Sequence, residues 1–260
     1  MFLRVLKLRF PVVASGFLAA ALVLSGCASQ EALNAPGGIY DPHEENNRQT
    51  HEWNKAIDKH LVAPLSQGWG GATSGGVREV VANFSSHLQL PNDIINNVLQ
   101  GDLDSAFQNT GRFAVNTVVG FAGLFDPAAD LNLTREEADF GQTLHVWGAG
   151  EGPYVELPVW GPSTQRDAVG VGVDLALNPF IVILQDPQVY IGLVAYVFDA
   201  MGDRYTFDAT VSSVLHESAD SYAQARSIYL QNRRYELGMS AEDIYLDPYL
   251  DPYSDPYEDF

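Results

Sequence analysis

The sequence predicts a mainly α-helical protein with a single domain. Apolar residues recur at helical spacing in several segments, whereas alternating period-two runs, the pattern of half-buried strands, are few. The length of 260 residues allows one large domain or two small ones. After the N-terminal segment, no apolar run reaches the about 18 residues that a membrane-spanning helix needs. We therefore expect no transmembrane helix in the mature chain.

The N-terminal segment has the features of a bacterial export signal. Basic residues precede the stretch 10–24, which is largely apolar and short for a membrane span. The segment ends in Leu24-Ser25-Gly26-Cys27, which resembles a lipobox, the motif whose Cys is acylated after cleavage on its N side. Cys27 is the only Cys in the chain. We therefore expect residues 1–26 to be a lipoprotein signal peptide and Cys27 to be the lipid anchor. The alternative is an uncleaved N-terminal anchor with a free thiol.

The residues after the expected anchor bear on its location. Ala28 follows the Cys, where Asp is the usual inner-membrane retention signal in many Gram-negative bacteria, so the sequence favours the outer membrane. Residues 27–40 are predicted to form an acylated, flexible tether. Acyl chains bury methylenes at about 0.8 kcal/mol each, so several chains anchor a protein durably.

The charge of the chain excludes two modes of binding. With 14 Lys and Arg against 33 Asp and Glu, the formal net charge is -19. This acidity argues against nucleic-acid binding and against docking on lipid through a polybasic patch. Residues 239–260 contain an Asp-Pro-Tyr repeat with Pro at every fourth position, which excludes a helix, and we expect a disordered acidic tail. A calcium site in the tail is the alternative, although the EF-hand spacing is absent.

Residues 41–238 are expected to form the helical domain. Asp41 and Pro42 are expected to begin the first helix, because Asp is a good N-cap and Pro suits the first helical position. A glycine-rich loop is expected over 68–76. The apolar stripe of the first helix has a spacing of four: Trp53, Ile57 and Leu61.

Three further helices follow that loop. The second has a clear 3.6-residue period, Pro91 and Asn92 are expected to start the third, and Gly101 is expected to cap its C-terminus. The fourth covers about 106–118. The apolar positions of the second helix are Val77, Val80, Val81, Phe84 and Leu88. The residues of the third helix that are expected to face inward are Ile94, Ile95, Val98 and Leu99.

The second half of the chain is less regular. Residues 139–162 are rich in Gly and Pro and are expected to form loops. Helices are expected to resume at Thr164, to begin again at Asp186-Pro187, and to end with a helix over about 219–237. The helix after Pro187 has an apolar stripe: Val189, Tyr190, Leu193, Val194, Val197 and Phe198.

No segment carries a catalytic or metal-binding signature. The G-x-S-x-G, H-E-x-x-H and P-loop motifs are absent from the sequence. His43, His51 and His60 fall near one face of the first helix and are interpreted as exposed polar positions. His216-Glu217 and its neighbouring serines resemble a hydrolase fragment, but such pairs arise by chance in most sequences. We expect no enzyme activity, no catalytic residue, no metal and no cofactor.

A series of short segments follows in a fixed order behind the lipobox. They are Asp41-Pro42 with Asn47-Arg48, Asn83-Phe84, Gln100-Gly101, Gly111-Arg112-Phe113 with Asn116-Thr117, Gly123-Leu124-Phe125-Asp126, Asp139-Phe140-Gly141-Gln142-Thr143-Leu144, Trp147-Gly148, Gly152-Pro153-Tyr154-Val155-Glu156-Leu157-Pro158, Gly161-Pro162-Ser163 with Arg166-Asp167, and Tyr229-Leu230-Gln231-Asn232-Arg233-Arg234-Tyr235. Together they resemble the MlaA (VacJ) family of outer-membrane phospholipid-transport lipoproteins. The ordered set is specific, although no single tripeptide is decisive.

The resemblance implies a fold and a function. Family members are ring-shaped helical bundles that are lipid-anchored in the periplasmic leaflet of the outer membrane and have a central amphipathic channel. Mislocalised phospholipids of the outer leaflet pass through the channel to a soluble periplasmic carrier, which feeds an inner-membrane ABC transporter complex, so that lipid asymmetry is maintained. Trimeric porins commonly hold the lipoprotein. The alternative is a lipoprotein that only organises porins and transports nothing.

The resemblance also supplies candidate residues. The apolar, glycine-rich loop over 120–130 corresponds to a hairpin that is thought to control the channel, and its glycines permit rearrangement. The alternative is that this loop only plugs the ring into the bilayer. The loop candidates are Gly120, Phe121, Gly123, Leu124, Phe125 and Asp126.

Other family motifs supply candidates for which an intramolecular, structural role is favoured. They are Asn47, Arg48, Phe140, Gly141, Gln142, Arg166 and Asp167. Two features depart from the family. Residues 51–53 lack its aromatic-Asn-aromatic pattern, and the Asp-Pro-Tyr tail has no family counterpart.

Overall fold

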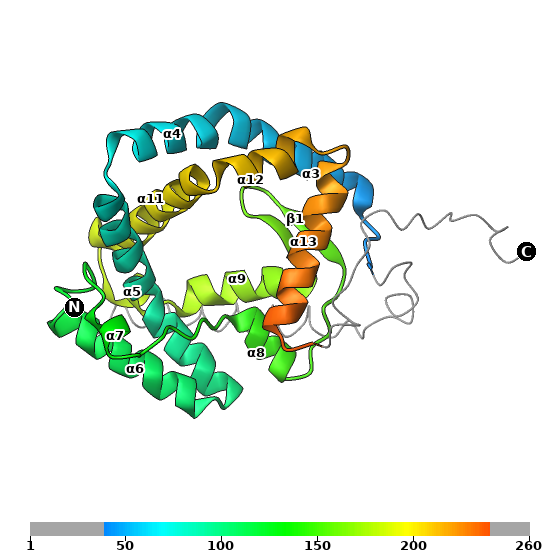
Figure 1. The fold of residues 1–260 in the computed structure, drawn as a ribbon. Helices are drawn as coiled ribbons and strands as arrows, with labels where there is room; N and C mark the ends of the chain where they lie inside the picture. The colour runs from blue at the N-terminus through cyan, green and yellow to red at the C-terminus, as the bar shows by residue number, and fades with distance from the viewer. Residues whose placement is uncertain (1–38, 240–260) are drawn as a thin grey trace, which may run out of the picture.

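A computed structural model describes residues 39–239 of the chain, and it is mainly helical, as the sequence predicts (Figure 1). Within that range, no helix has the length and apolarity needed to cross a bilayer. The expected signal peptide, the anchor at Cys27 and the acidic tail from residue 240 lie outside the described residues.

The described chain contains helices of very different length and one short hairpin. The elements up to α8 are α3 (Glu44–Ile57), the π-helix η2 (Asp58–Val62), α4 (Ala63–Ala72), α5 (Gly75–Gln100), α6 (Leu103–Val118), α7 (Pro127–Asp130) and α8 (Phe140–Val146). The remaining elements are β1 (Tyr154–Leu157), β2 (Gly161–Thr164), α9 (Gln165–Leu177), α10 (Pro179–Ile183), the 3-10 helix η3 (Gln188–Tyr190), α11 (Ile191–Thr206), α12 (Asp208–Ser212), the π-helix η4 (Ser213–Glu217) and α13 (Ser221–Glu236).

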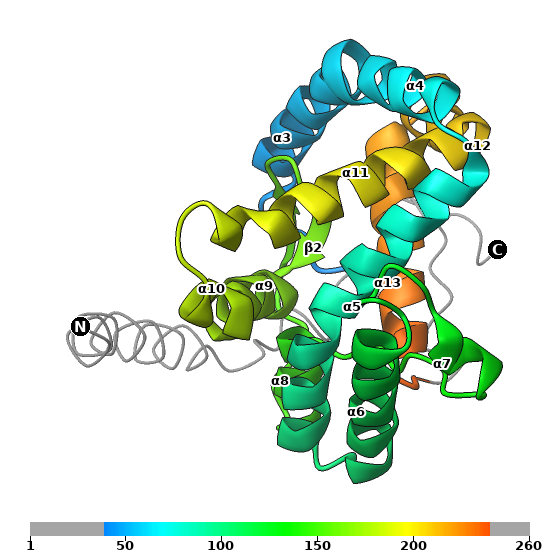
Figure 2. The same ribbon diagram turned by 90° about the vertical axis from the view of Figure 1, so that its left-hand side faces the viewer.

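The ribbon runs around a ring, as the resemblance implies (Figure 1). Helices α3 and α4 form one side, α5 the next, α8 and α9 the side opposite α4, and α13 returns toward α3. The view turned by 90° shows α5 and α6 side by side, and these two helices are in contact (Figure 2). Helix α11 packs along α4 and α5, and α8 packs on α9. Each helix is therefore supported mainly by its neighbours in the ring.

Several helix ends form where the sequence places them. Gly101 ends α5 with φ at 79°, the left-handed conformation that glycine adopts without strain, and this confirms the expected C-cap. Thr164 caps α9 by accepting the N–H of Asp167, and Asp220 caps α13 by accepting that of Ala223. The last helix is therefore confirmed to within two residues at its start.

Three predicted boundaries are wrong. Helix α3 begins at Glu44, and Asp41 does not cap it, because that carboxylate accepts hydrogen bonds from Asn47 and Tyr222 instead. Most of the expected loop over 68–76 is helical, because α4 continues to Ala72 along α11. Pro91 lies inside α5 rather than at a helix start. An internal proline costs about 3 kcal/mol, and here the packing of α5 on α6, α8 and α11 outweighs it.

The region 139–162 contains more regular structure than the sequence predicts. It includes α8 and strand β1, which pairs antiparallel with β2 in the register Tyr154 to Thr164 and Leu157 to Gly161. The hairpin packs on α3 and α9. The strands have four residues each, which is too short for alternation to be recognised in the sequence.

The inward direction expected for the apolar residues at 94–99 is wrong for part of that segment, and another apolar stripe is exposed as well. On α5, Val98 and Leu99 are 52% and 37% exposed, while Asp93, Asn96 and Asn97 are buried. On α11, the predicted stripe from Tyr190 to Phe198 is also exposed. Among the described residues, buried polar and charged side chains outnumber buried hydrophobic ones. The helices therefore pair through polar groups and turn their large apolar side chains outward.

The buried hydrophobic residues form two small clusters within the described part of the chain. Tyr154, Tyr222 and Leu230 join the hairpin to α13. The second cluster joins α8 to α9 and consists of Phe140, Leu144 and Val173. These clusters cover only one part of the ring, so other helix pairs depend on close backbone approach and polar contacts.

A pair of glycines tests the contact of α4 with α11. A Cβ at Gly70 would lie 2.1 Å from Cγ of Tyr205 on α11, whereas a Cβ at Gly71 would meet nothing within 4 Å. We expect Gly70→Ala to lower the free energy of unfolding by about 1–3 kcal/mol through overpacking. Gly71→Ala is the control and should change it by at most about 1 kcal/mol, in the stabilising direction. Denaturant unfolding in detergent measures both, and equal stability of the two variants would contradict the contact.

Candidate functional site

The apolar loop between α6 and α7 folds into a compact turn. Its N–H groups donate to carbonyls of the last turns of α6 and of the loop itself, so it behaves as an extension of that helix. The bonds are Ala122 N to Thr117 O (3.0 Å), Gly123 N to Asn116 O (2.9 Å) and Phe125 N to Gly120 O (2.9 Å). A Cβ at Gly120 would lie 2.4 Å from the carbonyl oxygen of Phe125, so this turn requires glycine at that position.

The middle of the loop holds an uncommon backbone conformation. Phe121 and Ala122 have φ angles of 53° and 59°, in the left-handed region that side chains disfavour. Each such residue costs on the order of 1–3 kcal/mol and persists only where surrounding contacts over-determine it. Gly123 follows with φ at 90°, which glycine adopts without a Cβ clash. The loop is therefore held in place by contacts with α5 and α6.

One of those contacts lies beneath Gly123. A Cβ on this residue would be 2.3 Å from Cγ of His87 on α5, so the loop backbone rests directly on the imidazole. The other support is an ionic contact at the loop exit. The carboxylate of Asp126 accepts hydrogen bonds from Arg112 and from Asn116 (2.8 Å), both on α6, and caps α7. The loop is thus fixed in its middle and at its exit.

The apolar side chains of this loop point into solvent-accessible space. Phe121 and Phe125 are 72% and 54% exposed, and their rings meet edge to face with centroids 6.1 Å apart. Leu124 is exposed as well. Other large apolar residues of α6 and of the segment that follows it are also exposed: Leu103, Phe107, Val118, Val119 and Leu131. The exposed apolar side chains of the loop are of the kind that meets a lipid or a protein.

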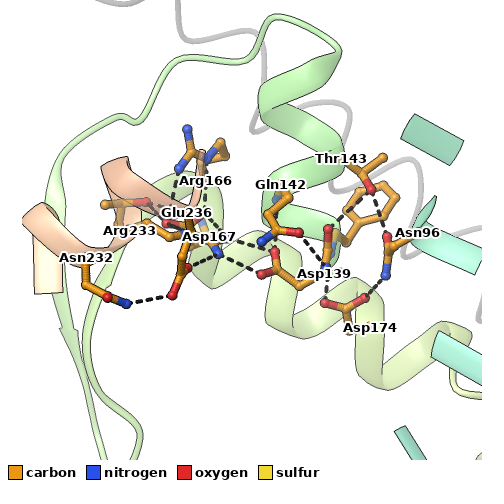
Figure 3. A network of polar contacts seen from close by, with 12 residues as sticks. Asn96, Asp139, Gln142, Thr143, Arg166, Asp167, Asp174, Asn232, Arg233 and Glu236 are labelled. Atoms are coloured by element: carbon orange, nitrogen blue, oxygen red, sulfur yellow. Dashed lines mark hydrogen bonds and ion pairs between the residues drawn. The ribbon is translucent and has the colours of Figure 1, made fainter. Parts of the chain in front are cut away.

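The candidates over 140–142 and 166–167 come together in a second cluster (Figure 3). Arg233 of α13 donates to Asp139 (2.7 and 2.8 Å) and to Asp167 (3.0 and 3.2 Å). A Cβ at Gly141 would lie 2.4 Å from Oδ1 of Asp167, so this bridge needs glycine beside it. Gln142 and Asp139 form a capping box at the start of α8. The cluster therefore joins α8, α9 and α13.

The charges in this cluster are balanced inside the protein. Arg166 donates to the adjacent Asp167 (3.0 Å), and both side chains are buried. Burial alone would raise the pKa of Asp167, but hydrogen bonds and charge from Arg233 and Arg166 outweigh it and lower the pKa to about 2. Burial raises the pKa of Asp174, which accepts the N–H of Phe140 and the amide of Asn96 nearby. These groups join α8, α9 and α13, and the structural role that the sequence favours for Phe140, Gly141, Gln142, Arg166 and Asp167 stays a prediction.

Asn47 and Arg48 fasten α3 to other elements. The amide of Asn47 donates to the carbonyl of Tyr154 (3.1 Å) and accepts the N–H of Glu156 (3.0 Å), as a neighbouring strand would. Arg48 donates through both Nη atoms to Asp220 (3.0 and 2.9 Å), the N-cap of α13. Ion pairs therefore fasten α13 at both ends, Arg48 with Asp220 at its start and Arg233 with Asp139 and Asp167 near its end. These contacts of Asn47 and Arg48 do not involve the loop over 119–126.

His51 is a correction to the sequence analysis, because it is buried rather than exposed. Its Nδ1 lies 3.2 Å from Glu156 and its Nε2 lies 3.1 Å from the Ser221 hydroxyl, the atomic order of a hydrolase triad. All three residues are 6% exposed or less, and Glu156 is also bonded to Tyr154 and Asn54. The arrangement therefore links α3, β1 and α13 and gives Ser221 little access to a substrate.

Sequence reasoning missed the partners that make these sites. Arg233, Asp139, Arg112 and His87 are not among the candidates, although the first three stand in the family segments. The Asp-x-x-Gln pattern at Asp139 is a capping signal that could have been found. Among the described residues, no group of three or more His, Cys, Asp or Glu could hold a metal ion.

The geometry defines a class of protein, a helical ring with polar groups buried between its helices and large apolar side chains turned outward. A family model described as MlaA lipoprotein matches residues 39–236. The chain therefore belongs to the MlaA lipoprotein family, which confirms the resemblance.

Known relatives cover most of the chain. The intermembrane phospholipid transport system lipoprotein MlaA of Shigella flexneri is 32% identical over 88% of this chain and 89% of that protein. The protein of the same name from Haemophilus influenzae is 29% identical over 85% and 88%. A chain solved in work on the structural basis for maintenance of bacterial outer membrane lipid asymmetry matches with a TM-score of 0.66 and 30% identity, over 76% of this chain and 98% of that one.

The low pKa of Asp167 leads to a prediction about acid stability. Because the pKa of Asp167 is lower than its ordinary value of 3.8, the ionised carboxylate stabilises the fold fully at pH values above 3.8. This contribution is lost as the pH falls toward about 2. We expect Asp167→Asn to cost about 3–5 kcal/mol at pH 7, because the buried Arg166 loses its carboxylate partner and Arg233 loses one of its partners. The difference from wild type should shrink by roughly 2 kcal/mol at pH 2. Denaturant unfolding at both pH values measures it, with exposed Asp104→Asn as the near-neutral control. A difference independent of pH would count against the assignment.

The buried triad-like arrangement leads to a second prediction. Because Ser221 and His51 are enclosed, we expect the folded protein to resist labelling by a fluorophosphonate probe, which attacks accessible activated serines. Mass spectrometry of the treated protein measures this, with a known serine hydrolase as the positive control. Labelling of Ser221 that disappears in His51→Asn would overturn the structural assignment.

Proposed function

We propose that the protein is a lipid-anchored protein of the outer membrane that removes mislocalised phospholipids from the outer leaflet. The lipids would pass through an amphipathic channel of the ring to a soluble periplasmic carrier that feeds an inner-membrane ABC transporter complex. The names of the relatives support phospholipid transport, and the match to a chain from work on outer membrane lipid asymmetry supports the location. Anchoring through Cys27 and attachment to a trimeric porin belong to the proposal through the family resemblance.

The observation that carries the proposal is that the ring buries polar side chains and exposes large apolar ones. Exposed apolar side chains occur on helices all along the chain, from Trp53 on α3 to Leu193 on α11. Helices with an apolar outer face can lie in a membrane without spanning it. The net charge of -19 opposes attraction to anionic lipid, so apolar contact and the acyl anchor would supply the affinity.

The polar groups between the helices are also compatible with a protein that lies in a membrane. Ionic and amide side chains at membrane depth are tolerated where they are paired inside the protein or line a water-filled path. A phospholipid has a charged head and apolar tails, so a conduit must offer both kinds of surface. The loop over 119–126 supplies exposed aromatic side chains next to paired charges at Arg112 and Asp126. We therefore place lipid contact at this loop.

Loss of the gene tests the function as a whole. We expect more phospholipid in the outer leaflet and greater sensitivity to detergent plus chelator. An unchanged outer leaflet would contradict transport. Disturbed porins with an unchanged leaflet would support the alternative, a lipoprotein that only organises porins.

A matched pair of glycine variants tests the loop. Gly123 and Gly148 both have φ at 90°, but only a Cβ at Gly123 clashes, at 2.3 Å from His87. We expect Gly123→Ala to displace the loop and to raise outer-leaflet phospholipid toward the deletion level, whereas Gly148→Ala stays near wild type. Outer-leaflet phospholipid is measured at equal protein levels, together with capture of phospholipid by a photo-crosslinker at position 121. Equal effects of the two variants would remove the loop from the mechanism.

A further inference from the structure

His87 has a chemical environment that neither the family motifs nor the proposed function explains. The side chain is 5% exposed and lies on α5 beneath the loop. One face of its ring stacks on Phe113, with centroids 4.7 Å apart and planes 5° from parallel. Gly123 lies against the ring so closely that a Cβ there would be 2.3 Å from Cγ. The imidazole is therefore enclosed between α6 and the loop.

The hydrogen bonds assign the tautomer of this ring. The hydroxyl of Thr117 donates its single hydrogen to the carbonyl of Phe113 (2.6 Å), so it can only accept from Nε2 of His87, 3.3 Å away. Nε2 therefore carries the hydrogen, and Nδ1 is a bare nitrogen. Nδ1 is buried and has no hydrogen-bond partner. A proton added there would create a buried N–H that nothing accepts.

The surrounding charge also disfavours a second proton. Burial lowers the pKa of His87, and the positive charge of Arg112 on α6 lowers it further. Arg112 is the charged group whose field reaches the ring, and its carboxylate partner is Asp126 at the exit of the loop. Phe113, Thr117 and Gly123, which contact the ring, carry no charge.

We infer that His87 is the positioning residue of the loop over 119–126, which rests on the neutral imidazole and is released when the imidazole is protonated. Gly123 packs on Cβ, Cγ and Cδ2 of His87, so lifting the loop opens the enclosure of the ring to water, which can accept the hydrogen on Nδ1. The imidazole of His87 therefore binds a proton more tightly when the loop is released than when it is seated. Acidification thus shifts the population toward the released loop. The inference rests on the proposed function only in that the loop is where lipid passage is controlled.

The sign and size of the effect follow from linkage. When the loop is released, the imidazole of His87 regains an ordinary pKa of about 6.5. When the loop is seated, the pKa of His87 is lower. The seated state is therefore fully favoured above about pH 6.5 and is lost as the pH falls below it. Between the two pKa values, the ratio of released to seated loop rises by up to about tenfold per pH unit.

The test reads the loop in the full-length protein. Trifluoromethyl-phenylalanine replaces Phe121, and fluorine NMR in lipid nanodiscs follows its resonance from pH 7.5 to 5.5. We expect a second resonance to grow as the pH falls, while far-UV circular dichroism stays constant. His87→Gln keeps an N–H for Thr117 and cannot titrate, so its spectrum should not change with pH. His145→Gln removes another half-buried histidine with a lowered pKa, on α8, and should keep the wild-type response.

Every outcome decides the inference. A pH response that persists in His87→Gln, or no response in the wild type, overturns it. If His87→Gln does not fold, His87→Phe preserves the stack on Phe113 without a titrating group and should give the same flat profile. The measurement needs no transport, so loop release can be observed even if deletion of the gene leaves the outer leaflet unchanged, and the two failures are distinguishable.

Discussion

The fold depends on ion pairs that join elements far apart in the sequence, and some of these pairs are buried. Arg233 joins Asp139 across 94 residues, Arg204 joins Asp58 across 146, and Arg48 joins Asp220 across 172. A ring has no single interior in which all helices can bury apolar faces together, so each helix must be fixed to its neighbours locally. An ion pair has directional geometry, and where the pair is buried, as at Arg204 and Asp58, losing one partner leaves a buried charge that costs several kcal/mol. These pairs therefore fix the angles of the ring, while apolar surface remains available outside it.

That arrangement explains which parts of the fold the sequence could predict. The 3.6-residue period showed that helices exist, and Gly101 and Thr164 marked their ends correctly. The same period shows which face of a helix is apolar, but it does not tell whether that face meets a protein core or a bilayer. Val98 and Leu99 were placed inward for this reason, and the neighbouring Asp93, Asn96 and Asn97 are the buried residues. His51 was placed outward on the same assumption and is 2% exposed.

The candidate site was predictable in part. Composition alone marks the loop at 120–125 as unusual, since few soluble segments combine glycine and phenylalanine so densely. Its exit partners Arg112 and Asn116 lie within 14 residues of Asp126, one helix away in the sequence. By contrast, the contact of Gly123 with His87 depends on how α5 meets α6, and Pro91 wrongly divided α5 into two helices. The bridge from Arg233 to Asp139 and Asp167 has no local signal, because charges of both signs are common near helix ends.

The two ends of the described chain meet, and this has a consequence for assembly. Asp41 accepts hydrogen bonds from Tyr222 and Arg226, which lie 181 and 185 residues later, and α13 is the last helix of the described chain. Bringing together the ends of so long a segment costs conformational entropy and therefore slows folding. The contacts that stabilise the closed ring form only when both ends are present. The proposed export would move the N-terminal end first, so that α3 would wait for α13 with its polar groups unpaired. In that case the ring closes only after the whole domain has crossed the inner membrane, and an open arc precedes the closed ring.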